Sequence, residues 1–132
     1  MKVAEFIVDG FEQIEALTPV DLLRRAGITV DTVSVFDEKK VKSSHDVVIE
    51  TDKNMKDINF DDCEMLILPG GPGTGNYEKP DFLMERLLNF SKNEKKHIAA
   101  ICAAPGVLAR LGMLKNKKAV SFPSVESDLE KN

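Results

Sequence analysis

The stretch Ile98-Ala-Ala-Ile-Cys102-Ala-Ala-Pro-Gly-Val107 decides how this chain is expected to fold. It joins a short apolar run, typical of a buried strand, to a helix of small and branched residues predicted over residues 103–111. Small side chains suit such a sharp turn because the backbone of the helix passes close to the strand. Cys102 stands where the nucleophile stands in a strand–turn–helix elbow.

The Cys102 thiol has two interpretations. A helix N-terminus presents unpaired N–H groups and the positive end of a dipole, and both stabilise a thiolate. The alternative is a small buried cysteine used as a core hydrophobe. Cys63 lies among Asp61, Asp62 and Glu64, and we expect these acidic neighbours to raise the pKa of its thiol and leave it unreactive.

Outward from the elbow, strand patterns alternate with helical patterns, which predicts a parallel sheet with helices on its faces. Pro19 leaves two possibilities for the first helix: a start at Pro19 capped by Thr18, or a longer bent helix from near Phe11. The apolar spacing upstream of Pro19 favours the longer helix. The expected strands are 2–8, 28–35, 45–50 (paired with residues near 40–42 in an edge hairpin), 65–68, 97–101 and 119–122. The expected helices are 11–25, 80–90, 103–111 and one starting at 125–129.

The composition is that of an ordinary globular protein. The chain has 132 residues, 42% apolar and 30% charged, with a net charge of −4, and we expect one domain over residues 1–132. The acidic balance argues against nucleic-acid and anionic-membrane partners. No apolar stretch is long enough to span a bilayer or to form a signal-peptide core, so a cytoplasmic location with reduced thiols is expected. No cluster of His, Cys and carboxylate has metal-ligand spacing, and no metal is predicted.

Two further features bear on chemistry. Leu68-Pro-Gly-Gly-Pro-Gly-Thr-Gly75 follows a buried strand but lacks the Lys-Ser/Thr ending of a phosphate-binding loop. Its Gly70 and Gly71 either form a structural turn or point N–H groups at whatever binds Cys102, as an oxyanion hole does. Glu15 is either a solvated helix-face charge or a carboxyl that reaches Cys102 from the carboxyl ends of the strands, where ligands collect in open α/β sheets.

Three motifs, in order and over essentially the whole chain, resemble the ThiJ/PfpI superfamily and in particular its DJ-one branch. They are Gly10-Phe-Glu-Gln-Ile-Glu15-Ala-Leu-Thr-Pro-Val-Asp-Leu-Leu-Arg-Arg-Ala-Gly27, Leu68-Pro-Gly-Gly71 and Ala99-Ala-Ile-Cys102-Ala-Ala-Pro105. The resemblance implies a flavodoxin-like sheet with helices on both faces, similar to the class I glutamine amidotransferases, usually a homodimer and without a cofactor. It also implies an oxidisable Cys102 hydrogen-bonded to a protonated Glu15, with the N–H groups of Gly71 and Ala103 facing the same pocket. Such a carboxyl would donate to the thiolate and, after oxidation, to a sulfinate.

The chain departs from the family pattern at several points. Ala103 stands where peptidase-like branches carry a histidine, which argues against a protease. Phe122-Pro123 stands where the DJ-one branch can place a histidine before a proline, so neither position supplies a base. The family normally continues with a last strand and a C-terminal helix, which we expect to be missing here. His45 matches a position near the partner's pocket in related dimers, which implies that it faces the second subunit's cysteine.

Two functions follow from the resemblance. The first is a redox-responsive, stress-protective protein in which Cys102 is oxidised stepwise. The second is a cofactor-free enzyme of the glyoxalase or deglycase type, in which Cys102 adds to a small reactive carbonyl and Glu15 moves the proton. Thiazole-phosphate biosynthesis, a label attached to ThiJ-like sequences, has no phosphate site in this chain to support it.

Overall fold

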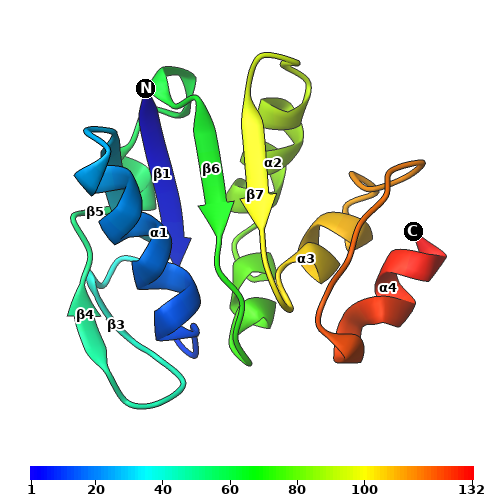
Figure 1. Cartoon of the computed structure of the whole chain (residues 1–132), viewed down its shortest axis with the longest axis horizontal. Coiled ribbons are helices and arrows are strands. Elements are labelled where there is room, and N and C mark those ends of the chain that lie inside the picture. Colours follow the sequence, from blue (N-terminus) through cyan, green and yellow to red (C-terminus); the bar gives the residue numbers. More distant parts are fainter.

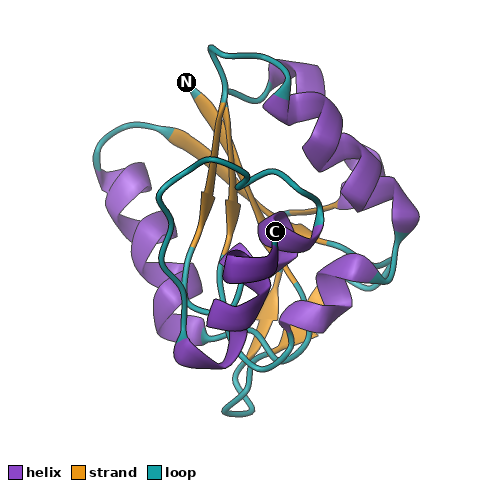
Figure 2. Ribbon diagram, turned by 90° about the vertical axis from the view of Figure 1, so that its right-hand side faces the viewer, coloured by secondary structure: helices purple, strands orange, loops and turns teal.

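A five-stranded parallel sheet in the order β5-β2-β1-β6-β7 forms the centre of the molecule. The computed structural model describes all residues 1–132. Helices cover both faces of the sheet, as Figures 1 and 2 show. This is the predicted flavodoxin-like architecture. The elements are β1 (Lys2–Ile7), α1 (Gln13–Arg25), β2 (Thr29–Ser34), β3 (Lys40–Lys42), β4 (Val48–Glu50), β5 (Lys53–Asn54), β6 (Met65–Leu68), α2 (Asp81–Ser91), β7 (His97–Ala100), α3 (Pro105–Arg110) and α4 (Glu126–Lys131).

The two faces of the sheet have separate apolar cores because side chains alternate along each strand. On β1, Ala4 and Phe6 join the larger core, which α2 and α3 cover. Val3 and Ile7 face the opposite side, where α1 packs over them with Val20 and Ala16. The sheet is therefore buried on both faces near β1, as parallel sheets usually are.

The strand register brings the candidate residues to one edge of the sheet. Leu68 at the end of β6 pairs with Ala100 at the end of β7. Gly70 and Cys102 therefore each lie two residues beyond a strand end, next to each other. Because all five strands are parallel, the loop that follows β1 opens at the same edge.

The prediction for the first helix is confirmed, because α1 runs through Pro19 without a break. The edge hairpin is confirmed as well, with β3 and β4 antiparallel, although β4 begins at Val48 and leaves His45 in the turn. The two-residue strand β5 beside β2 was not predicted.

Two predictions near the C-terminus are wrong. Residues 119–122 form no strand, because the segment does not lie along β7 (Figure 1). It is attached to the elbow instead, where the N–H of Phe122 donates to the carbonyl of Cys102 at 2.7 Å. The helix expected over residues 103–111 is shorter and begins at Pro105, which suits the first turn of a helix. The helix expected at residues 125–129 is confirmed as α4.

Candidate functional site

Cys102 lies in a tight turn between β7 and α3 with a backbone φ of 62°. This left-handed conformation is uncommon for a residue with a side chain. The turn is closed by hydrogen bonds from Ile101 N–H to the carbonyl of Leu68 (3.3 Å) and from Ala104 N–H to the carbonyl of Ile101 (3.0 Å). The half-buried thiol is thereby held at the carboxyl edge of the sheet.

The glycine-rich loop after β6 interlocks with the loop after β1. Gly73 N–H donates to the carbonyl of Gly10, and Glu12 N–H donates to the carbonyl of Gly70, both at 3.0 Å. A Cβ on Gly71, whose φ is 110°, would lie 2.6 Å from the Glu12 nitrogen. The two loops can approach this closely only because a glycine stands at the crossing.

Glu15 reaches the elbow from the first turn of α1. Glu12 caps this helix, since its Oε2 accepts from the Glu15 N–H at 2.8 Å. The Glu15 Oε2 in turn accepts from the Gly70 N–H at 2.9 Å. A Cβ on Gly70 would lie 2.7 Å from both this oxygen and the Cβ of Cys102. The absence of a side chain at Gly70 therefore leaves the space that the Glu15 and Cys102 side chains occupy.

The Glu15 carboxyl and the N–H groups of Ala103 and Gly71 are the polar groups that act on the sulfur of Cys102. The structure thus brings Glu15, Gly71 and Ala103 to the Cys102 thiol. The expectation for Gly70 needs correcting: its N–H donates to the Glu15 Oε2 at 2.9 Å and is therefore not free for a ligand of the thiol.

The pKa of Cys102 is raised from its ordinary value, first by burial and then by the hydrogen bond and negative charge of an ionised Glu15. The N–H groups of Ala103 and Gly71 act in the opposite direction. The expected help from a helix N-terminus is small, since α3 has six residues and begins three residues after Cys102. The state of the thiol therefore depends on whether its carboxyl neighbour holds a proton.

A hollow of about 650 Å³ opens above the thiol. His45 and Ser44 from the hairpin turn line it within the same chain, so His45 lies at the pocket of its own chain's cysteine. Phe122, which is 52% exposed, contributes an apolar side chain to the pocket at the position where the family resemblance allows a histidine. The lining residues are Glu12, Glu15, Ser44, His45, Gly71, Pro72, Cys102, Ala103, Phe122 and Ser124.

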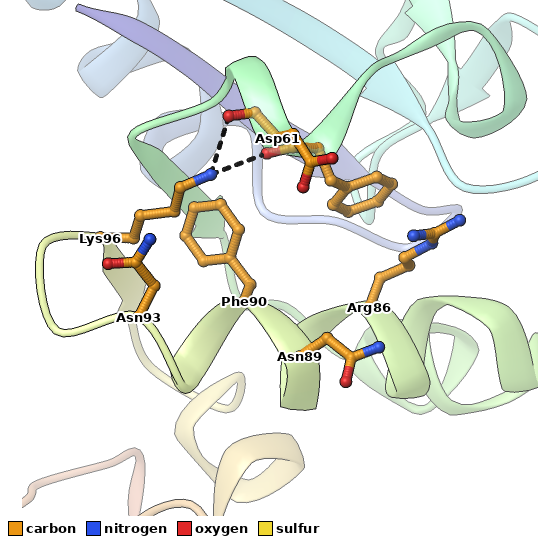
Figure 3. Close-up of a pocket in the computed structure, with 7 residues that line it drawn as sticks. Asp61, Arg86, Asn89, Phe90, Asn93 and Lys96 are labelled. Atoms are coloured by element: carbon orange, nitrogen blue, oxygen red, sulfur yellow. Dashed lines mark hydrogen bonds between the residues drawn. The ribbon is translucent and has the colours of Figure 1, made fainter.

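A second hollow lies at the opposite end of the sheet, beside the residue that precedes β7 (Figure 3). Its Lys96 donates to the carbonyls of Phe60 (3.3 Å) and Asp61 (2.9 Å) and lies 4.8 Å from the ring centre of Phe90. Lys96 therefore serves to join a loop to α2. The hollow contains no cysteine, serine or histidine side chain.

The remaining candidates lie apart from the site. Cys63 is 1% exposed, and the pKa of its thiol is raised chiefly by burial, with Asp31 and Asp62 as smaller contributors. His97 begins β7 at the end opposite the elbow. No group of three or more His, Cys, Asp or Glu side chains is arranged to hold a metal ion. None of the helices combines the length and the apolar character needed to cross a membrane.

Tyr77 supports the site and was missed in the sequence. Its hydroxyl lies 2.9 Å from the carbonyl of Phe6 and 3.0 Å from that of Pro69, to which it donates. Burial raises the pKa of this phenol well above its ordinary value, and the charges of Glu5 and Glu15 add to the effect. Tyr77 therefore ties β1 to the start of the glycine-rich loop as a neutral donor. A lone tyrosine downstream of the loop carried no signal of this role.

The fold and the site together define a flavodoxin-like protein with a cysteine–glutamate pair at a strand–turn–helix elbow. The family model described as the DJ-1/PfpI family matches residues 1–132, and the chain belongs to that family.

Relatives of this chain extend beyond it in length. "Protein dj-1beta" of Drosophila melanogaster is 36% identical over 126 residues, covering 96% of this chain and 67% of that protein. "Glutathione-independent glyoxalase DJ-1" of Schizosaccharomyces pombe is 33% identical, covering 98% and 72%. The solved structure of oxidized Toxoplasma gondii DJ-1 superposes with a TM-score of 0.89 at 34% identity, covering 96% and 70%.

Proposed function

We propose that this chain is a redox-responsive, stress-protective protein in which Cys102 is the oxidisable residue. The observation that carries the proposal is the set of groups around the sulfur: the Glu15 carboxyl and the N–H groups of Gly71 and Ala103. A relative of similar fold has been solved in an oxidized form. The two N–H groups suit an anionic sulfur and its oxidation products, whose oxygens accept hydrogen bonds.

Cys102 and Glu15 act as one acid pair. With Glu15 ionised, a thiolate beside it would place two negative charges in contact, which raises the pKa of the thiol. When the proton stays on the carboxyl, the same contact becomes a hydrogen bond donated to the thiolate, and the two N–H groups add to it. The pair then carries a single negative charge, which resides on sulfur.

Mild hydrogen peroxide is expected to add oxygen to Cys102 and not to Cys63, because Cys63 is 1% exposed whereas the half-buried Cys102 lines an open hollow. Glu15→Ala is expected to slow this oxidation, since the thiolate loses its donor. The measurement is the rate of mass gain on each cysteine-containing peptide by mass spectrometry.

Cys63→Ser is the matched control and should oxidise at Cys102 like the wild type. Preferential oxidation of Cys63 would contradict the proposal. Faster oxidation of Glu15→Ala would show that Glu15 is ionised when the thiolate forms. It would contradict the hypothesis that the Glu15 carboxyl donates a hydrogen bond to the thiolate.

A second candidate is a cysteine-dependent activity on small reactive carbonyls. The N–H groups of Gly71 and Ala103 are placed as donors for the oxyanion that forms when a thiolate adds to an aldehyde. Two relatives are named a glyoxalase and a deglycase.

If this second function is correct, the chain is expected to convert methylglyoxal slowly. The rate should be lost in Cys102→Ser and should increase in Phe122→His, because the new imidazole lines the pocket and can act as a base. The formation of lactate is the quantity to follow. Equal lactate formation by wild type and Cys102→Ser would exclude the activity.

We extend the proposal to assembly and location. Exposed apolar side chains on α1, among them Ile14 and Leu22, offer a surface for a homodimer. A cytoplasmic location fits a function that needs a reduced thiol to start from.

A further inference from the structure

His45 is the one imidazole that faces the Cys102 hollow. Its Nδ1 lies 3.1 Å from the hydroxyl oxygen of Ser44, within hydrogen-bond distance. When Nδ1–H donates to this oxygen, Nε2 is the nitrogen that takes up and releases a proton. Imidazole is the side chain best suited to do so near neutral pH.

The turn that carries His45 is firmly attached to the site. The buried hydroxyl of Ser43 accepts from the N–H groups of His45 (3.3 Å) and Val47 (3.1 Å). Ser44 N–H donates to the carbonyl of Phe11 at 2.8 Å, in the loop that leads to Glu15. His45 is thus held above the pocket by backbone bonds, although its ring reaches the solvent.

Other side chains of the hollow cannot serve as its proton donor. Glu12 is occupied as the cap of α1. Glu15 accepts from the Gly70 N–H and belongs to the proposed pair with the thiol, so it is already engaged. Phe122 is apolar.

We propose that His45 is a catalytic residue for oxidation of Cys102 by a hydroperoxide, and that it protonates the leaving oxygen. The inference rests on the proposed function. The thiolate attacks one peroxide oxygen, an S–O bond forms and the O–O bond breaks. The departing oxygen takes the electron pair of that bond and receives the proton of the His45 imidazolium. The products from hydrogen peroxide are a sulfenic acid on Cys102, water and neutral His45. Ser44 is a positioning residue that holds the ring.

The test compares two reactions of the same sulfur. Oxidation by hydrogen peroxide needs a proton for its leaving group, whereas alkylation by iodoacetamide releases iodide and needs none. His45→Asn is expected to lower the second-order rate constant for oxidation on the order of a hundredfold and to leave that for alkylation unchanged. His97→Asn, at the far end of β7, is the matched control and should change neither.

Ser44 variants add an independent readout. Ser44→Ala is expected to slow oxidation less than His45→Asn does, and Ser44→Thr, which keeps the hydroxyl, to restore the wild-type rate. The proposal is overturned if His45→Asn slows both reactions equally, because His45 would then act on the thiolate itself, or if it slows neither. Failure of the proposed function is seen separately, in the wild type, as oxidation of Cys63 in preference to Cys102.

Discussion

Glu5→Gln is expected to stabilise the folded chain by roughly 3 kcal/mol at pH 7. Glu5 lies in the middle of β1, between Thr32 of β2 and Ile67 of β6 in the register, and is 0% exposed. Neither carboxyl oxygen has a hydrogen-bond partner. Burial therefore raises the pKa of Glu5 from 4.5 to about 9, and the charge of Arg24 opposes the shift only in part.

The sign of the pH dependence follows from that shift. The folded chain keeps the Glu5 proton up to about pH 9, whereas the unfolded chain releases it near pH 4.5. The contribution of this group to stability is complete below pH 4.5 and is lost progressively as the pH rises to about 9. Glutamine has no proton to lose, so the gain from Glu5→Gln grows with pH over this window.

Urea unfolding at several pH values between 5 and 9 measures the effect. Glu50→Gln on the exposed face of β4 is the matched control, and its unfolding free energy should follow the wild-type profile. Parallel profiles for wild type and Glu5→Gln would show that the buried carboxyl finds a partner or solvent, and would contradict the prediction.

Gly70→Ala is expected to remove most of the reactivity of Cys102 and to destabilise the fold by about 1–3 kcal/mol. The new methyl carbon would lie 2.7 Å from the Cβ of Cys102 and the Oε2 of Glu15, and 2.8 Å from the carbonyl oxygen of Ile101. The two functional side chains must move apart to admit it. A displacement of about 1 Å can lower the rate of a positioned reaction by on the order of a hundredfold.

The rate of iodoacetamide alkylation at Cys102, with the unfolding free energy, measures both effects. Gly75→Ala is the matched control, because a Cβ there meets nothing within 4 Å. It should alkylate and unfold like the wild type. Unchanged alkylation in Gly70→Ala would mean that the close approach of Glu15 and Cys102 is not needed for reactivity.

Local sequence signals were sufficient for four strands of the sheet, all but β5, and for the position of the elbow. The apolar spacing of α1 outweighed the helix-breaking tendency of Pro19, since packing on the sheet stabilises the helix on both sides of it. The strand before Cys102 and the small residues after it located the elbow. The family motifs then singled out Glu15, Gly71 and Ala103, which the structure brings to the sulfur.

Features that depend on distant contacts were not predictable. Residues 119–122 have strand-forming side chains but no neighbouring strand to pair with, and a strand needs both. The strand expected over residues 2–8 contains Glu5, whose complete burial depends on β2, β6 and α1 together. The N–H direction of Gly70 likewise depends on how deeply Glu15 enters between the loops.

The left-handed backbone at Cys102 has a consequence for how this protein can change. A residue with a side chain in that conformation is destabilised by on the order of 1 kcal/mol relative to glycine. Cys102→Gly is therefore expected to raise the free energy of unfolding and to abolish the reactivity of the elbow. Random variants screened for heat resistance alone should accumulate glycine at this position, whereas variants screened for survival under peroxide should retain cysteine. The two screens would therefore distinguish the contribution of residue 102 to the stability of the turn from its contribution to peroxide resistance.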